Sequence, residues 1–290
     1  MNALGICDKG KSGVYAEEMS SWPSNRRFTV LDFQAAKERQ EPWVMLTCYD
    51  AMTAGLFEDA GAKALLVGDT AAMVVYGHET TLPVTVDELL PLAAAVVRGS
   101  KQTFVVGDLP FGSYQESPAQ AVATAVRFMK EAGVHGIKLE GGAQVLPQIE
   151  AIVSAGIPVM GHLGLTPQSV HALGGMQRVQ GRGEAGERLL ADAKALEHAG
   201  VFAMVLEAVP AELGALVSKA VGVPVVGIGA GSETDAQVNV WQDLVGLTAG
   251  RLPRFVKQYA NVREVMHNAV NAFVNDVRDR KYPDASHSYE

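Results

Sequence analysis

A short apolar run that ends in a polar residue recurs five times along this chain, and this repeat constrains the fold more than any other feature. The runs are too short for helices and are typical of buried parallel strands. Each run delivers a polar side chain to the carboxyl end of its strand, and these side chains are Asp69, Asp108, Glu140, His162 and Glu207. Five such side chains in series predict one shared site.

Four of the runs follow an Ala-Gly pair, whose glycines are Gly61, Gly133, Gly156 and Gly200. Glycine is the residue that best tolerates the left-handed conformation found at helix ends. The chain repeats one pattern, in which a helix, a glycine, a short strand and a polar strand-end residue follow one another. This repeat predicts βα units in a parallel sheet. With about eight units the expected fold is an α/β (β/α)₈ TIM barrel, whose active site lies at the carboxyl ends of the strands.

The chain divides into three predicted parts. Residues 1–27 have mixed composition and little periodicity, and are expected to be a disordered N-terminal extension without chemistry. Residues 28–250 are expected to form the barrel, with strand seven at 223–228 and strand eight at 238–245. Residues 251–290 are expected to be a C-terminal helical segment, amphipathic up to residue 280, that packs on the barrel or on a neighbouring subunit.

Composition excludes several classes of protein. A chain of 290 residues that is 48% hydrophobic fits one large α/β domain. A net charge of −8 argues against a nucleic-acid surface. There is no apolar stretch of membrane-spanning length and no signal-peptide core near residue 1, so we expect a cytoplasmic protein without a membrane partner. With only Cys7 and Cys48, a disulfide framework is not expected.

Three of the strand-end residues are the carboxylates Asp69, Asp108 and Glu140. Packed within a few ångströms of one another, they would repel unless a cation lay among them. Oxygen ligands without an accompanying Cys or His cluster favour Mg²⁺ over Zn²⁺. Each acid alone could instead cap a helix or pair with a local base. For the three together, a magnesium site is the prediction.

The remaining strand-end residues suggest acid–base chemistry. Lys138 lies two residues before Glu140, so both face the barrel interior, where a lysine needs an anionic partner from a neighbouring carboxylate or from a substrate. Glu207 has apolar neighbours in sequence, and a carboxylate in apolar surroundings suits a general base. His162 is either a hydrogen-bonded core residue or an accessory catalyst.

Two long connections follow strands and are expected to cover the site. The first spans residues 71–83, after Thr70. The second is rich in glycine and spans residues 164–183. Long βα loops over the catalytic face of a barrel are usually functional.

Longer motifs make the chain resemble the ketopantoate hydroxymethyltransferase family over residues 28–290. The resemblance implies an enzyme of pantothenate biosynthesis that uses Mg²⁺. Its reaction moves a hydroxymethyl group from methylenetetrahydrofolate to 3-methyl-2-oxobutanoate, which gives ketopantoate and tetrahydrofolate. Family enzymes form large rings, so self-association as a homodecamer is also implied. The motifs lie at residues 46–50, 66–69, 77–85, 108–111, 138–142, 161–170 and 227–231.

The resemblance also implies roles for single residues. The family's metal positions fall on Asp69, Asp108 and Glu140. Contacts with the oxo acid fall on Asp69, Thr70, Asp108 and Lys138, and the proton acceptor is Glu207. We expect Mg²⁺ to stabilise the enolate that forms when this acceptor removes the C3 proton.

The chain departs from the family's pattern at three positions. Thr70 stands where Ser is usual and keeps the hydroxyl, whereas Ala236 and Asn239 replace a glycine-containing turn and an apolar strand residue. Two other functions stay open. One is a Mg²⁺-dependent carbon–carbon lyase of the phosphoenolpyruvate/pyruvate barrel superfamily, although such lyases typically carry a catalytic cysteine and none follows Cys48. The other is a non-catalytic metabolite-binding relative, against which the retained candidate residues argue.

Overall fold

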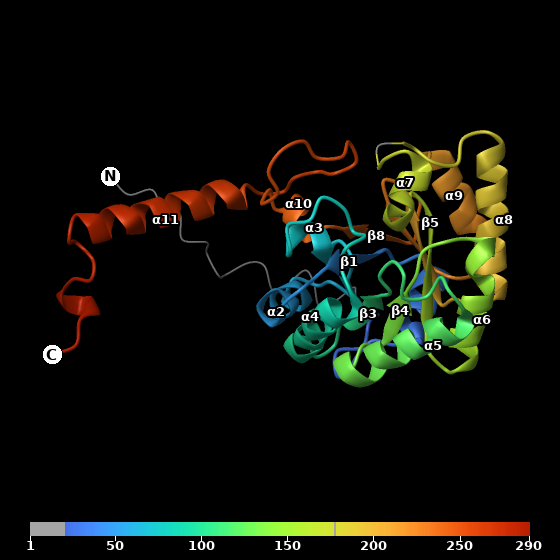
Figure 1. Ribbon diagram of the computed structural model, residues 1–290, viewed down its shortest axis with the longest axis horizontal. Helices are drawn as coiled ribbons and strands as arrows, with labels where there is room; N and C mark the ends of the chain where they lie inside the picture. Colours follow the sequence, from blue (N-terminus) through green and yellow to red (C-terminus); the bar gives the residue numbers. More distant parts are fainter. Residues whose placement is uncertain (1–20, 177) are drawn as a thin grey trace.

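Eight parallel strands, hydrogen-bonded in chain order, close into a barrel in the computed structural model, which describes residues 21–176 and 178–290 (Figure 1). The barrel closes where the last strand pairs with the first. The predicted TIM barrel is therefore confirmed. The strands are β1 (Trp43–Thr47), β2 (Ala64–Val67), β3 (Phe104–Asp108), β4 (Gly136–Lys138), β5 (Val159–Gly164), β6 (Ala203–Glu207), β7 (Val225–Ile228) and β8 (Ala236–Asn239).

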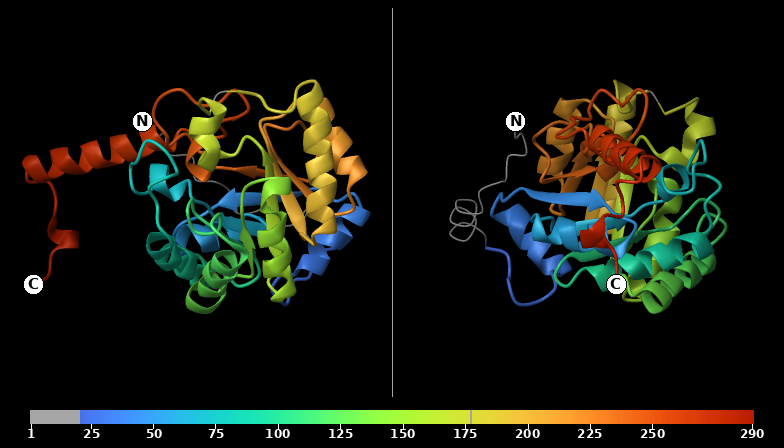
Figure 2. Two further views of the ribbon diagram at one scale, coloured as in Figure 1. Left: turned by 45° about the vertical axis from the view of Figure 1, so that its right-hand side comes forward. Right: turned by 90° about the vertical axis from the view of Figure 1, so that its left-hand side faces the viewer.

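Helices form the outer layer around this barrel (Figure 2). Neighbouring helices contact each other, α2 with α4, α5 with α6, and α8 with α9. Their bounds are α2 (Ala51–Asp59), α3 (Ala71–Val74), α4 (Val86–Gly99), α5 (Pro118–Arg127), the π-helical η1 (Phe128–Ala132), the 3₁₀ turn η2 (Ala143–Val145), α6 (Leu146–Ser154), the 3₁₀ turn η3 (Pro167–Ser169), α7 (Val170–Leu173), α8 (Glu184–His198), α9 (Ala211–Ala220) and α10 (Trp241–Leu244).

Local sequence sets where several of these helices begin and end. The Asp50 side chain accepts two backbone N–H groups at the start of α2, and Thr85 and Glu88 form a reciprocal capping box at the start of α4. The hydroxyl of Ser117 caps α5. Gly133, with a φ of 74°, ends the helical segment after α5 in the left-handed conformation predicted for it.

The barrel interior is apolar at the amino ends of the strands and charged at the carboxyl ends. On β3, Phe104 and Val106 face the interior, and Asp108 follows two residues later on the same side. Helix α1 (Val30–Glu38) covers the amino end. Its Phe33 is buried there, with its ring centroid 4.6 Å from that of Trp43 and 5.4 Å from that of Phe104. Polar chemistry is thereby confined to one end.

The strand-eight region differs from the prediction. The strand ends at Asn239, and the residues after it form α10 rather than continuing to residue 245. Ala236 is 1% exposed, pairs with Trp43, and is not among the residues with positive φ, so alanine fits there without strain. The side-chain oxygen of Asn239 is buried and accepts no hydrogen bond within the described residues.

The C-terminal helix is shorter than predicted and projects from the barrel (Figure 1). It is α11 (Val262–Arg278), followed by the 3₁₀ turn η4 (Ala285–His287), so the prediction of helix was wrong for residues 251–261. No residue of α11 is buried, and its first turn contacts the body through backbone N–H groups of Val262 and Arg263. The residues before α11 do pack on the barrel, since Phe255 lies against Gly229 and the Tyr259 N–H donates to the Leu244 oxygen. Packing of α11 on a neighbouring subunit stays a prediction.

Part of the expected N-terminal extension belongs to the core. Residues 1–20 lie outside the described residues, but Trp22 is 8% exposed and packs edge-on against Phe28 and Phe33. The Arg27 guanidinium donates to the backbone oxygens of Ser100 and Thr103. The expectation of a disordered leader therefore needs correction for residues 21–27. No helix of the described residues could span a bilayer.

We predict that Trp22→Ala lowers the free energy of unfolding by about 3 kcal/mol, because it empties an aromatic site at the closed end of the barrel. Activity per folded molecule should stay unchanged, because this end is remote from the strand carboxyl ends. Urea unfolding measures the first effect and an assay at saturating substrate the second. Trp22→Phe, which keeps an aromatic ring, should lower the free energy of unfolding by a smaller amount. A stable but inactive Trp22→Ala variant would contradict the assignment.

Candidate active site

A buried ion pair joins two neighbouring strands at the carboxyl end of the barrel. Asp108 on β3 and Lys138 on β4 are register partners, and Lys138 Nζ lies 2.7 Å from Asp108 Oδ1. Burial alone would lower the pKa of Lys138, but the carboxylates of Asp108, Glu140 and Asp69 together raise it. Of the two anionic partners expected for this lysine, the structure shows the neighbouring carboxylate.

Asp69 lies beside this pair, two residues past the end of β2. It is buried, and its backbone N–H donates to Asp108 Oδ2 at 3.1 Å. Burial raises the pKa of Asp69 well above its usual range, and the charges of Asp108 and Glu140 raise it further. Burial also raises the pKa of Asp108, although Lys138 opposes this. The two aspartates therefore share the single positive charge of Lys138, which does not compensate both.

His162, within β5, lies between two glutamates. Its Nδ1 lies 3.3 Å from Glu140 Oε1, and its Nε2 lies 3.3 Å from Glu207 Oε2. Burial and Lys138 lower the pKa of His162, but its contacts with both glutamates outweigh them and raise it to about 9. Burial acts to raise the pKa of Glu140, but the hydrogen bond and charge of His162 lower it overall. A carboxylate therefore lies beside each ring nitrogen of His162, although Nε2 forms no hydrogen bond with the described residues.

Two predicted residues lie at the open side of this cluster. The Glu207 side chain is 16% exposed, whereas those of Glu140 and His162 are 3% exposed, so Glu207 is the acid that a substrate can reach. Thr70 follows Asp69 at the start of α3 and is half-buried. Its hydroxyl forms no hydrogen bond with another described residue and is available to a ligand.

Three buried polar residues at the site escaped the sequence reasoning as functional candidates. Gln168, in η3, donates to Asp69 and Glu140. Tyr114, in the loop after β3, contacts the backbone of Glu140. Tyr49, just past β1, has a buried hydroxyl without a hydrogen-bond partner among the described residues. The available signal was that Gln168 and Tyr49 lie in the motifs at residues 161–170 and 46–50.

The carboxylates fit a hard cation in chemistry, but they do not form a closed cage. Within residues 21–176 and 178–290, no three His, Cys, Asp or Glu side chains converge closely enough to hold a metal ion together. Mg²⁺ does not need such a cage, because it usually binds one or two protein carboxylates and completes its shell with water and substrate oxygens. The carboxylates of Asp69 and Asp108 are candidate oxygen donors, and the charge of Asp108 helps to raise the pKa of Asp69. This donor set suits Mg²⁺.

Solved structures with a similar fold include phosphonopyruvate hydrolase in complex with oxalate and Mg²⁺. That chain matches with a TM-score of 0.57 and 14% identity, over 90% of this chain and 93% of that one. A 2,3-dimethylmalate lyase of the PEP mutase/isocitrate lyase superfamily matches with a TM-score of 0.53 and 17% identity, over 88% and 87%. At such low identity these likenesses show a shared barrel fold and do not carry over a lyase activity.

Comparison with protein families and with related sequences identifies the family of this chain. The family model described as ketopantoate hydroxymethyltransferase matches residues 27–285. The 3-methyl-2-oxobutanoate hydroxymethyltransferase of Frankia casuarinae is 61% identical over 92% of this chain and 90% of its own length. That of Thermobifida fusca is 58% identical over 92% and 95%. With the motifs at the strand ends, these matches show that the chain belongs to the ketopantoate hydroxymethyltransferase family.

Proposed function

We propose that this chain carries out its family's reaction, hydroxymethyl transfer to 3-methyl-2-oxobutanoate in pantothenate biosynthesis, with Glu207 as the base and methylenetetrahydrofolate as the donor. One observation carries the proposal. A reachable carboxylate, Glu207, lies across His162 from a buried cluster of acids that suits a cation. Such a site can bind an oxo acid and remove a proton next to its carbonyl group.

Asp69 and Asp108 are proposed to hold Mg²⁺, and Glu140 is the third predicted ligand, although its two oxygens already contact Gln168 and His162. When bound, the ion would supply Lewis-acid polarisation of the carbonyl group of the oxo acid. Lys138 donates to Asp108 and, with three N–H groups on its ammonium, can also donate to a substrate carboxylate. The Thr70 hydroxyl is a further contact for the oxo acid.

Glu207 takes the C3 proton in this proposal. Its Oε2 lies 3.3 Å from His162 Nε2, and no described residue donates a hydrogen bond to either carboxylate oxygen, so the carboxylate is free to accept the proton. The electron pair of the broken C–H bond forms the new C–C bond to the methylene carbon of the folate. Both C–N bonds of that carbon break, water supplies the hydroxyl oxygen, and tetrahydrofolate leaves with its two nitrogens protonated. His162, buried between Glu140 and Glu207, orients the base and is its accessory residue.

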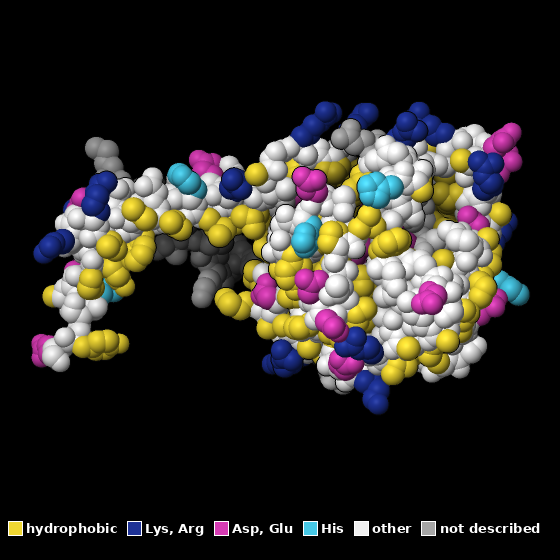
Figure 3. Space-filling view, in the orientation of Figure 1, with side chains coloured by type: hydrophobic (Ala, Val, Ile, Leu, Met, Phe, Trp, Pro, Cys, Tyr) yellow, Lys and Arg dark blue, Asp and Glu magenta, His cyan; other side chains and the backbone are white. Residues whose placement is uncertain are grey.

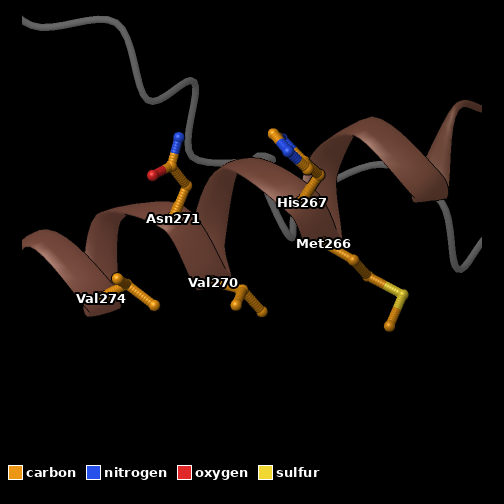
Figure 4. Close-up of a pocket in the computed structure, with 5 residues that line it drawn as sticks. All are labelled: Met266, His267, Val270, Asn271 and Val274. Atoms are coloured by element: carbon orange, nitrogen blue, oxygen red, sulfur yellow. The ribbon is translucent and has the colours of Figure 1, made fainter.

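We also propose that the chain assembles with copies of itself through α11, with a homodecamer as the expected assembly, and works in the cytoplasm. Figure 3 shows hydrophobic side chains gathered along the projecting helix. In Figure 4, Met266, Val270 and Val274 lie on one side of α11, away from His267 and Asn271. The exposed fractions of these three apolar side chains exceed half, and a second subunit would cover them.

We predict that the protein exchanges the C3 proton of 3-methyl-2-oxobutanoate for deuterium in D₂O with Mg²⁺ and without folate. Glu207→Gln should slow this exchange by at least about 100-fold, because the amide keeps the shape of the carboxylate but lacks its basicity. Proton NMR follows the loss of the C3 signal. Calorimetry should show that the variant still binds the oxo acid.

The matched control is Glu212→Gln, which changes a carboxylate to an amide in the first turn of α9, outside the cluster. It should exchange at the wild-type rate. Wild-type exchange in Glu207→Gln would place the base elsewhere, with His162 the next candidate. A binding protein would show no exchange in any form.

Lys138→Met should lower the free energy of unfolding by about 3 kcal/mol at pH 8 without Mg²⁺, because it leaves buried carboxylates without their ammonium. Asp69 and Asp108 have folded-state pKa values above their unfolded values, so their ionisation costs stability as pH rises through the interval between the two. The loss should therefore shrink at pH 5, and millimolar Mg²⁺ should offset part of it at pH 8. Urea unfolding in EDTA and in Mg²⁺ measures both effects. An equal loss under all three conditions would contradict the charge argument.

Val270→Glu should prevent assembly through α11, since it places a charge in the centre of the exposed apolar side. Sedimentation velocity should show smaller species than wild type. Asn268→Glu adds the same charge on the opposite side of the helix and should assemble normally. Unchanged sedimentation of Val270→Glu would show that subunits do not meet through this face.

A further inference from the structure

We infer that Gln168 is a positioning residue that orients Asp69 and Glu140 for the cation, an inference that rests on the proposed function. Gln168 lies in η3, in the glycine-rich connection after β5, and is 5% exposed. It is the one residue of the two long connections whose described hydrogen bonds reach two of the proposed ligands. The glycine-rich connection therefore contributes a buried side chain to the site.

The side-chain amide of Gln168 uses all of its hydrogen-bonding capacity. Its Nε2 donates to Asp69 Oδ2 and to the backbone oxygen of Leu109, both at 3.0 Å. Its Oε1 accepts from the Tyr114 hydroxyl at 2.8 Å and from Gln115 Nε2 at 3.2 Å. Two donors and two acceptors are satisfied, and the reverse orientation of the amide would place an oxygen against two oxygens. The orientation of the amide is thus fixed.

The backbone of Gln168 makes the second contact. Its N–H donates to Glu140 Oε2 at 3.0 Å, while Glu140 Oε1 lies against His162. On Asp69, Oδ2 is held by the amide, and Oδ1 accepts no hydrogen bond from the described residues. One residue therefore fixes two carboxylates and leaves a defined oxygen of Asp69 free to bind a cation.

Tyr114 connects this amide to the end of β4. Its hydroxyl accepts from the backbone N–H of Glu140 at 3.2 Å, and its one hydrogen faces two acceptors, Gln168 Oε1 at 2.8 Å and the backbone oxygen of Glu140 at 3.0 Å. Tyr114 is 1% exposed and Gln168 is 5% exposed, so the contact between these two side chains is shielded from water. Gln168 is therefore set relative to the strands, even though it lies in a loop.

A neutral donor is suited to this task. An ammonium or guanidinium on Asp69 would cancel the charge that attracts a cation, whereas an amide holds the carboxylate and leaves its charge in place. Residues that orient metal ligands in this way typically change metal affinity by about 10–100-fold when they are removed.

The test is calorimetric titration of Mg²⁺ into the full chain with 3-methyl-2-oxobutanoate present and no folate. Gln168→Met keeps the length of the side chain and removes its donors and acceptor, and should weaken Mg²⁺ binding about tenfold or more. At saturating Mg²⁺ its rate of C3 deuterium exchange should return to within about threefold of wild type, because the residue touches no reacting atom. Gln242→Met, at an amide that is 7% exposed and forms no described hydrogen bond to the carboxylates, should bind Mg²⁺ like wild type.

Tyr114→Phe keeps Gln168 but removes the hydroxyl that orients it, and should weaken Mg²⁺ binding several-fold. It decides the question if Gln168→Met does not fold. Wild-type Mg²⁺ affinity in the folded variants would overturn the inference alone. So would an exchange rate that stays low at saturating Mg²⁺, since that would make Gln168 a catalytic residue. If wild type itself binds no Mg²⁺, the proposed cation fails as well.

Discussion

The structure depends on keeping several charged side chains buried at one end of a barrel. Asp69, Asp108, Glu140 and Glu207 meet there with Lys138 and His162, and all except Glu207 are almost fully shielded from solvent. Isolated charges in such a place would neutralise or unfold the protein. Here each contacts an opposite charge or a hydrogen-bond donor, and the acids still exceed the bases. That excess is the physical basis for binding a cation and an oxo acid.

The rest of the fold supports this end from a distance. The aromatic rings of Trp22, Phe33, Trp43 and Phe104 pack at the opposite end of the barrel, where they provide apolar burial without adding polar groups. The strands connect the two ends, because alternate residues of one strand reach both the apolar layer and the charged layer. A change at the aromatic end is therefore expected to act on stability, and a change at the charged end on both stability and chemistry.

Much of the fold was predictable, because a buried parallel strand and a glycine-ended helix leave local marks in sequence. The prediction placed strand eight too late in the sequence. In the observed strand, Ala236–Asn239, apolar and polar residues alternate, so it lacks a continuous apolar run, and the residues that follow form α10. In the candidate site, the strand-end residues came from spacing, and the structure brings them together. The contacts of Gln168 and Tyr114 could not be predicted from spacing, because loop residues follow no periodicity, although Gln168 lies in the motif at residues 161–170. The spacing of Lys138 and Glu140 predicted that Lys138 faces the barrel interior, but it did not indicate that Lys138 forms its ion pair with Asp108.

The central claim is that this site joins a one-carbon unit to the C3 carbon of 3-methyl-2-oxobutanoate. The most direct measurement uses methylenetetrahydrofolate labelled with ¹³C at its methylene carbon, with the oxo acid and Mg²⁺, followed by NMR. We expect the label to appear in a new hydroxymethyl group of ketopantoate, at a rate that depends on enzyme and Mg²⁺ and is lost in Glu207→Gln. Folded wild-type protein that leaves the label on the folate under metal-replete conditions would contradict it.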